Sequence, residues 1–199
     1  MSEATSSHKD DLVGYLVSAR EALLWKTEGL SEYDLRRPLT PTSTNLLGLV
    51  KHVVSMGVTY FGTCLDRPFE VPMPWLDDDA EPNADLWVPA GQTRAEILDL
   101  WHRGWAHCDA TIATLPLDAT GTVPWWPPAG RHPTLHRLLA HVNAEVTRHA
   151  GHADILRELI DGRAGLRNGM TNLPSQDEFD WDAHHVRVQA AADRFNDSR

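Results

Sequence analysis

The chain has 199 residues, 42% of them hydrophobic, which is enough for one domain with a sizeable core. Its net charge of −10, without a clustered Lys/Arg face, makes it a poor candidate for nucleic-acid binding. No stretch approaches about 18 uncharged apolar residues, which excludes a membrane span, and the polar, acidic start MSEATSSHKDD excludes a secretory signal. We therefore expect a cytoplasmic protein.

Two long helices are predicted in the first third of the chain. Residues 9–30 carry apolar side chains at a helical period, at Leu12, Tyr15, Leu16, Ala19 and Leu23. A polar, proline-bearing connector follows. Residues 45–64 then form a second helix, with Asn45 or Thr44 as its N-cap. The inward stripe of this second helix contains Leu46, Leu49, His52/Val53, Met56 and Tyr60.

A long excursion and two further helices follow. Residues 66–91 hold five prolines and many Asp and Asn residues, which preclude a long helix and predict a loop with a task such as covering a pocket. Thr93 and Glu96 form a capping box that starts a helix over 93–115. After a second loop, Thr134 caps a helix over 134–162 that Gly162 ends. A short last helix is expected near 181–195.

These elements predict an all-α fold, a four-helix bundle with long crossover connections. We expect one domain over 1–199, with its core in 10–162 and a polar tail in 163–199. Cys64 and Cys108 lie far apart and outside any zinc-finger spacing, which favours reduced core residues over a catalytic thiol.

The helix over 134–162 carries an unusual polar face. Val142, Glu145, His149, His152 and Leu156 follow one another at spacings of three and four and therefore share one side of the helix. A buried carboxylate beside imidazoles is costly unless it is paired or bound to a metal. The sequence has 11 histidines, which also favours a metal or acid–base site.

Two pairs on this face could share one ion. Glu145 and His149, four residues apart, form one pair, and His149 and His152 form the rival pair. His52 is the obvious third donor, because it is the single histidine of its helix and lies on the inward stripe. Two His and one carboxylate suit Zn²⁺, and also Ni²⁺, Fe²⁺ or Mn²⁺.

Each donor also has a purely structural interpretation. His52 could be a hydrogen-bonded core histidine, and Glu145 could pair with Arg148 or Lys51 at the surface. His149 and His152 could be helix-margin residues that pair with Asp154 or Glu158.

Two segments carry a family resemblance. LLGLVKHVVSMGVTYFG, followed by HRLLAHVNAEVTRHAGHADILRELIDG, resembles the DinB-like superfamily, a group of YfiT-like metalloenzymes with a four-helix bundle. The signature E-x-x-R-H-x-G-H-x-D-I-x-R-E is similar to the actinobacterial branch, akin to mycothiol-dependent enzymes. The resemblance spans roughly residues 10–162.

The resemblance implies a metal held by His52, Glu145 and His149. Most of the superfamily has His where this chain has Glu145, and a His, Glu, His triad is similar to mycothiol-dependent maleylpyruvate isomerases. In that register His152 becomes a neighbour of the metal rather than a ligand. The implied cofactor is one divalent ion, and the implied co-substrate is a low-molecular-weight thiol such as mycothiol.

The implied function is a thiol S-transferase or isomerase that activates the thiol for attack on a small-molecule electrophile. His152 or His102 could move a proton in this reaction. Four tryptophans lie in the two long loops and could either line a binding site for an apolar electrophile or pack over the end of the bundle. They are Trp75, Trp87, Trp125 and Trp126. The alternatives are a metal-dependent hydrolase and a non-catalytic metal-binding stress protein. A homodimer is possible, and Tyr15, Trp25 and Trp101 could line its face or belong to the core.

Overall fold

The regular structure is helical throughout the part of the chain that the computed structural model describes, residues 7–175 and 177–196. Within that part, β pairing is limited to isolated bridges, which confirms the predicted all-α class. The long helices are α1 (His8–Trp25), α3 (Leu46–Phe61), α4 (Arg94–Thr114) and α5 (Leu135–Asp161). The shorter elements are α2 (Glu32–Arg36), η1 (Thr63–Leu65), η2 (Pro74–Leu76), η3 (Pro128–Gly130) and α6 (Trp181–Asp193).

The helix ends lie where the predicted caps place them. The Asn45 side chain accepts a hydrogen bond from the Gly48 amide at the start of α3, and Thr93 and Glu96 form a reciprocal capping box on α4. The Thr134 side chain caps α5, and Gly162 ends it in the left-handed conformation. Capping predicts these ends well because it depends only on residues within one helical turn.

The prediction for the first helix needs two corrections. α1 ends at Trp25 rather than near residue 30, because residues 26–29 form a turn that Gly29 closes with a positive φ of 72°. Tyr15, predicted on the apolar stripe, is 76% exposed and lies outside the core, whereas Trp25 is buried. The connector after α1 also contains α2, which starts at the Ser31 cap and was not predicted.

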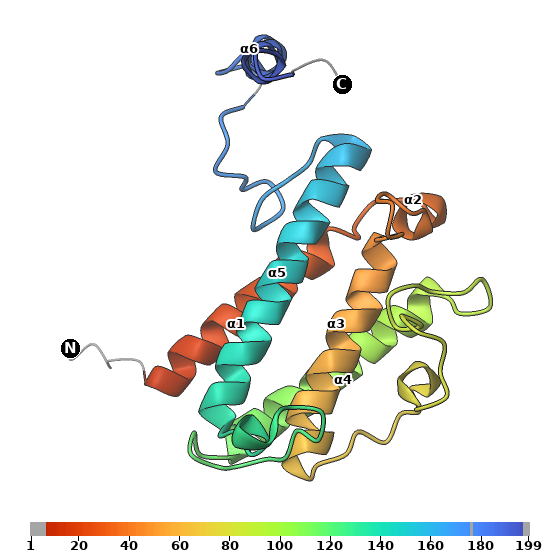
Figure 1. Cartoon of the computed structure of the whole chain (residues 1–199), viewed down its shortest axis with the longest axis vertical. Coiled ribbons are helices and arrows are strands. Elements are labelled where there is room, and N and C mark those ends of the chain that lie inside the picture. Colours follow the sequence, from red (N-terminus) through yellow and green to blue (C-terminus); the bar gives the residue numbers. More distant parts are fainter. Residues whose placement is uncertain (1–6, 176, 197–199) are drawn as a thin grey trace.

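The long helices pack in pairs, α1 on α5, α3 on α4, and α3 on α5 (Figure 1). Along α3, Gly57 abuts Trp105 and Gly62 lies near His107, so α3 and α4 run parallel. Two parallel helices that follow each other in the chain need a connection as long as the helix itself. This geometry explains the long connection between Phe61 and Arg94, which we call the excursion.

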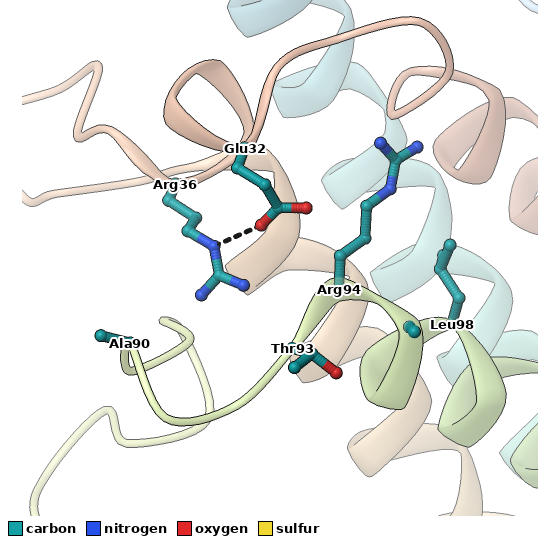
Figure 2. A pocket seen from close by; sticks show the side chains of 7 residues that line it. Glu32, Arg36, Ala90, Thr93, Arg94 and Leu98 are labelled. Carbon is teal, nitrogen blue, oxygen red and sulfur yellow. Dashed lines mark hydrogen bonds and ion pairs between the residues drawn. The ribbon is translucent and has the colours of Figure 1, made fainter.

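The excursion is fastened at its end by α2. Arg36 donates to the carbonyl oxygens of Val88, Pro89 and Gln92, and its Nε pairs with Glu32 at 2.8 Å. Figure 2 shows this pair at the edge of a shallow pocket of about 720 Å³ between α2 and the start of α4. Arg36 thus fixes the last residues before α4.

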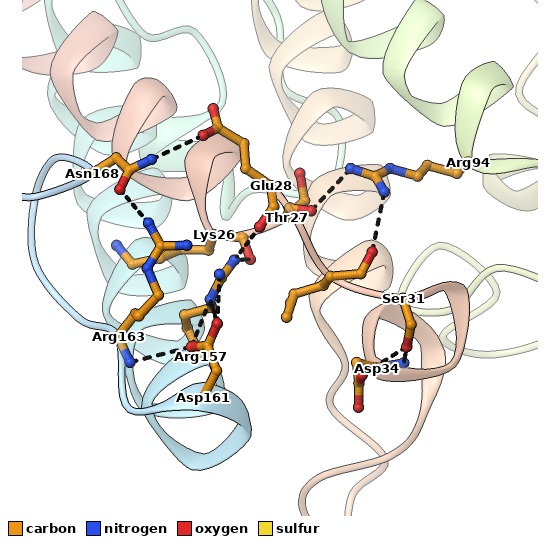
Figure 3. A network of polar contacts seen from close by, with 11 residues as sticks. Lys26, Thr27, Glu28, Ser31, Asp34, Arg94, Arg157, Asp161, Arg163 and Asn168 are labelled. Atoms are coloured by element: carbon orange, nitrogen blue, oxygen red, sulfur yellow. Dashed lines mark hydrogen bonds and ion pairs between the residues drawn. The ribbon is translucent and has the colours of Figure 1, made fainter.

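A polar network closes the end of the bundle where α1 and α5 finish (Figure 3). The buried Arg157 guanidinium donates to the carbonyl oxygens of Lys26 and Glu28 and pairs with Asp161 at 2.7 Å. Arg94 donates to the Thr27 and Leu30 carbonyl oxygens and so joins α4 to the same turn. The backbone carbonyl oxygens of this turn have no partner within a helix, and the charged side chains of Arg157 and Arg94 donate hydrogen bonds to them instead.

The chain just beyond α5 is hydrogen-bonded to the bundle, whereas α6 lies apart from it. Trp25 and Lys26 hold residues 165 and 166 through hydrogen bonds to backbone carbonyls. α6 lies near the predicted 181–195, apart from the four long helices in Figure 1, and buries none of its side chains. Between residues 7 and 196, position 176 excepted, no helix is long and apolar enough to cross a membrane.

Candidate metal centre

The antiparallel packing of α3 against α5 brings the predicted histidines together. The ring centroids of His52 on α3 and His149 on α5 lie 4.7 Å apart in an edge-on arrangement. Of the predicted inward stripe of α3, Leu46, Leu49, Val53 and Tyr60 are buried, whereas His52 and Met56 are half-buried. Two residues separated by almost a hundred positions therefore share one site.

His149 lies at the centre of the cluster. Its Nε2 is 3.8 Å from Oε2 of Glu145, and its ring is 5.4 Å from that of His152. Its side chain is only 13% exposed, and its Nδ1 is buried without a hydrogen-bond partner among the described residues. Burial, with the neighbouring His52, His152 and Arg148, lowers the pKa of His149 from 6.5 to about 4. The ring is thus neutral at pH 7, the form that binds metals.

His52 is oriented by a carboxylate that the sequence did not single out. Its Nδ1 lies 2.6 Å from Oδ2 of Asp85, a residue of the excursion. The hydrogen bond from His52 lowers the pKa of Asp85, so the carboxylate is ionised and accepts, and Nδ1–H of His52 must donate. In the neutral ring, the lone pair then lies on Nε2. This carboxylate–histidine arrangement is the one that metal-binding histidines commonly have.

Several contacts hold the excursion where Asp85 can reach His52. Lys51 donates to the carbonyl oxygens of Ala84 and Trp87, at 2.8 and 3.0 Å, and Asn45 donates to that of Leu86. The Leu86 oxygen also approaches Gly48 so closely that a Cβ there would lie 1.9 Å from it. Burial lowers the pKa of Lys51 to about 8.

Glu145 completes the set of predicted donors. Its side chain is 38% exposed on the same face of α5, one turn before His149. By donor type, two imidazoles and a carboxylate fit a divalent cation. Buried polar atoms normally have a partner, so the buried Nδ1 of His149, which has none among the described residues, calls for an explanation. In the described part of the chain, however, no group of three or more His, Cys, Asp or Glu side chains is arranged to hold a metal ion.

Two of the structural alternatives do not agree with the contacts. Lys51 points to the excursion rather than to Glu145. Asp154 pairs with Lys26 at 2.8 Å and accepts from the Gly165 amide, so it is engaged away from the histidines. The structural interpretation of His52 is correct in part, because it is hydrogen-bonded, but one ring nitrogen remains for another role.

The two predicted proton carriers differ in position. His152 is half-buried beside His149, whereas His102 is exposed on α4. α4 packs on α3 rather than on the face of α5 that carries Glu145 and His149. The geometry favours His152 over His102.

A comparison with protein families now adds to this geometry. The model of the mycothiol-S-transferase family matches residues 11–162, which contain α3, α4, α5, α1 except for its first three residues, and every predicted site residue. The chain belongs to the mycothiol-S-transferase family. No curated protein matches it significantly.

Membership of the mycothiol-S-transferase family makes the chain an enzyme of the thiol-transferase class and confirms its DinB-like, mycothiol-associated character. The cysteines agree with a thiol that comes from outside the chain. Cys64 and Cys108 are free and buried, and burial raises both pKa values, that of Cys64 to about 11. Neither thiol ionises readily at neutral pH, so neither has the character of a nucleophile.

Of the four loop tryptophans of this mycothiol-S-transferase family member, two pack against the bundle and two are exposed. Trp75 donates its indole N–H to Ser55, and Trp126 packs against the core. Trp87 and Trp125 are exposed. Trp75 and Trp87 line a pocket of about 420 Å³ with Lys51 and Ala84, on the excursion that carries Asp85. Neither this pocket nor the larger one at α2 is lined by His52, Glu145 or His149.

Proposed function

We propose that the chain is a divalent-metal-dependent thiol S-transferase, which activates a low-molecular-weight thiol such as mycothiol for attack on a small electrophile. The single observation that carries the proposal is the position of His149. It lies between His52 and Glu145, is neutral at pH 7, and has a buried ring nitrogen without a partner among the described residues. This donor set is found in a chain of the mycothiol-S-transferase family.

The proposed ligands are His52, Glu145 and His149, and zinc is the first choice of metal, with nickel, iron or manganese as alternatives. Because the three side chains are not gathered around one point, binding requires them to move. When bound, a divalent cation would lower the pKa of a thiol and stabilise it as the nucleophilic thiolate.

The residues of the chain have distinct tasks in this proposal. Asp85 fixes the His52 ring so that Nε2 faces away from the excursion. Glu145 supplies a negative charge that offsets the cation, and its partial exposure leaves one side of the site open to solvent and ligands. His152, next to His149, accepts the thiol proton and passes it to solvent.

Location and assembly are part of the same proposal. We place the enzyme in the cytoplasm, where low-molecular-weight thiols are kept reduced. We also propose a homodimer, with the exposed Tyr15 on α1 as a candidate contact. Trp25 and Trp101 are buried and do not contribute to such a face.

Cobalt substitution tests the proposal. A thiol that ligates Co²⁺ produces a sulfur-to-metal charge-transfer band, so mycothiol should add such a band to the Co²⁺-loaded protein. His149→Ala should lose this change, while His136→Ala, which removes an exposed histidine from the same helix, should keep it. No spectral change with mycothiol would contradict thiol activation at this site. Hydrolysis of an ester without any thiol, lost in His52→Ala, would favour the hydrolase alternative.

A further inference from the structure

A second polar pair lies on the same helix interface as the candidate ligands. Eight residues after His52 on α3 is Tyr60, and eight residues before His149 on α5 is His141. Because the two helices are antiparallel, a step of eight residues forward on α3 and eight residues back on α5 leads to residues that again face each other. The ring centroids of Tyr60 and His141 are 5.0 Å apart. At a rise of 1.5 Å per residue, the two pairs are about 12 Å apart along the helices.

The second pair is joined by a hydrogen bond. The Tyr60 hydroxyl lies 3.1 Å from Nε2 of His141. If Nε2 carries the proton, it donates to the phenolic oxygen, and the hydroxyl hydrogen of Tyr60 is left to donate to a third group. A pair of this kind can present a directed hydrogen-bond donor next to an apolar surface.

Tryptophans from the connection between α4 and α5 surround this pair. The Trp125 and Trp126 rings lie 5.7 and 5.9 Å from the Tyr60 ring, and Trp126 is 4.9 Å from that of His141. Trp125 is 56% exposed although it contacts a tyrosine that is only 8% exposed. Flat aromatic walls with one or two directed polar groups are typical of sites for small organic ligands.

We propose that Tyr60, positioned by His141, is the general acid of the transferase and marks the electrophile-binding end of its active site. This inference rests on the proposed function, because the thiol must reach the electrophile from the His52–His149 end. The substrate class is an aromatic or flat apolar electrophile whose reacting carbon bears oxygen, such as an epoxide. Its ring lies against Trp125 and Trp126, and its oxygen accepts from Tyr60.

The proposed step balances for an epoxide. The thiol first loses its proton to solvent. The thiolate sulfur then forms a bond to one epoxide carbon, the bond from that carbon to oxygen breaks, and the electron pair remains on oxygen. Tyr60 gives its proton to this oxygen, and solvent returns a proton to Tyr60 through His141. The net reaction joins thiol and epoxide into a hydroxy thioether without any oxidant or reductant.

Two matched electrophiles test the role of Tyr60. Styrene oxide requires a proton at its departing oxygen, whereas benzyl bromide has the same aromatic body and releases bromide without one. Tyr60→Phe should lower the ratio of kcat for styrene oxide to kcat for benzyl bromide by about 100-fold, the usual size of general-acid catalysis. Tyr33→Phe, at an exposed tyrosine of α2, should leave the ratio unchanged. An equal loss with both electrophiles would mean a structural role and would overturn the proposal.

Two His141 variants test its positioning role. Glutamine can donate from about the same place as Nε2, and phenylalanine cannot. His141→Gln should therefore retain a higher styrene oxide to benzyl bromide ratio than His141→Phe. The same ratio in both variants would remove His141 from the mechanism.

A binding measurement separates this inference from the proposed function. 1-Phenylethane-1,2-diol, the hydrolysed form of styrene oxide, should shift the indole N–H resonances of Trp125 and Trp126, assigned from Trp→Phe variants. Tyr60→Phe should weaken its binding by about three- to tenfold, the worth of one hydrogen bond. No shift of these two signals in the wild type overturns the electrophile site, even if thiol binding is intact. A shift without any turnover of thiol contradicts the proposed function instead.

Discussion

His52 and Asp85 are joined by a 2.6 Å contact between Nδ1 and Oδ2, which links the central helix α3 to the excursion between α3 and α4. The excursion therefore does more than connect two parallel helices. It places one carboxylate against the ring of a candidate metal ligand and fixes which nitrogen of that ring is free.

Asp85→Asn should weaken metal binding without unfolding the protein. The amide keeps the shape of the side chain and an oxygen acceptor, but it loses the negative charge that makes His52 a stronger ligand. Zinc affinity, measured by competition with a chromogenic chelator, should fall about 10- to 100-fold. Asp78→Asn, at an exposed position of the same excursion, is the control and should leave it unchanged. Equal affinity in all three proteins would show that Asp85 has no part in the site.

Gly48→Ala should displace the excursion from α3. The new Cβ would lie 1.9 Å from the Leu86 carbonyl oxygen, so the backbone next to Asp85 must move. We expect a loss of about 1–3 kcal/mol in the free energy of unfolding, as for other overpacked sites, together with weaker zinc binding.

Gly14→Ala is the matched control for this substitution. It is also a glycine within a helix, but nothing lies within 4 Å of its added Cβ. Alanine is favoured over glycine in a helix, so urea unfolding should show a gain of about 0.5–1 kcal/mol. A similar effect of both substitutions would mean that the contact with Leu86 does not matter.

The metal-free protein should lose stability in mild acid because of His149. Its pKa is about 4 in the folded protein against 6.5 as the ordinary value, so the unfolded chain takes up this proton first as the pH falls. The contribution of His149 to the free energy of unfolding should therefore be lost between about pH 6.5 and about pH 4, by on the order of 3 kcal/mol. Urea unfolding of the metal-free protein at these two pH values measures this change in the free energy of unfolding.

His149→Gln provides the comparison for the acid effect. Glutamine keeps polarity at this position without a titrating ring, so the variant should lose less stability over the same pH interval. An equal loss in wild type and variant would assign the acid sensitivity in this pH interval to other groups.

The long helices and most of their ends could be predicted because periodicity and capping are local properties. The meeting of His52 with His149 was also predictable, since each lies on the inward face of its helix. Asp85 was not, because its contact depends on the path of an excursion without periodicity, and the nearby Asp77, Asp78 and Asp79 look no different in sequence. The Tyr60–His141 pair follows from the helix register, which only the folded chain reveals.

Errors near α1 have a physical cause as well. A helical period fits Tyr15 and the residues after Trp25 equally well. The helix nevertheless stops, because Arg157 and Arg94 satisfy the carbonyl oxygens of the turn after it, including those of Lys26 and Thr27. Such tertiary contacts come from positions far away in the chain.

The most direct test of the metal centre is the zinc content of the purified protein and its variants. We expect about one zinc ion per chain in the wild type and in His136→Ala, and a large loss in His52→Ala, Glu145→Ala and His149→Ala. His152→Ala should keep the metal. Loss of zinc in His152→Ala with retention in Glu145→Ala, or no bound metal in the wild type, would contradict the assignment of His52, Glu145 and His149.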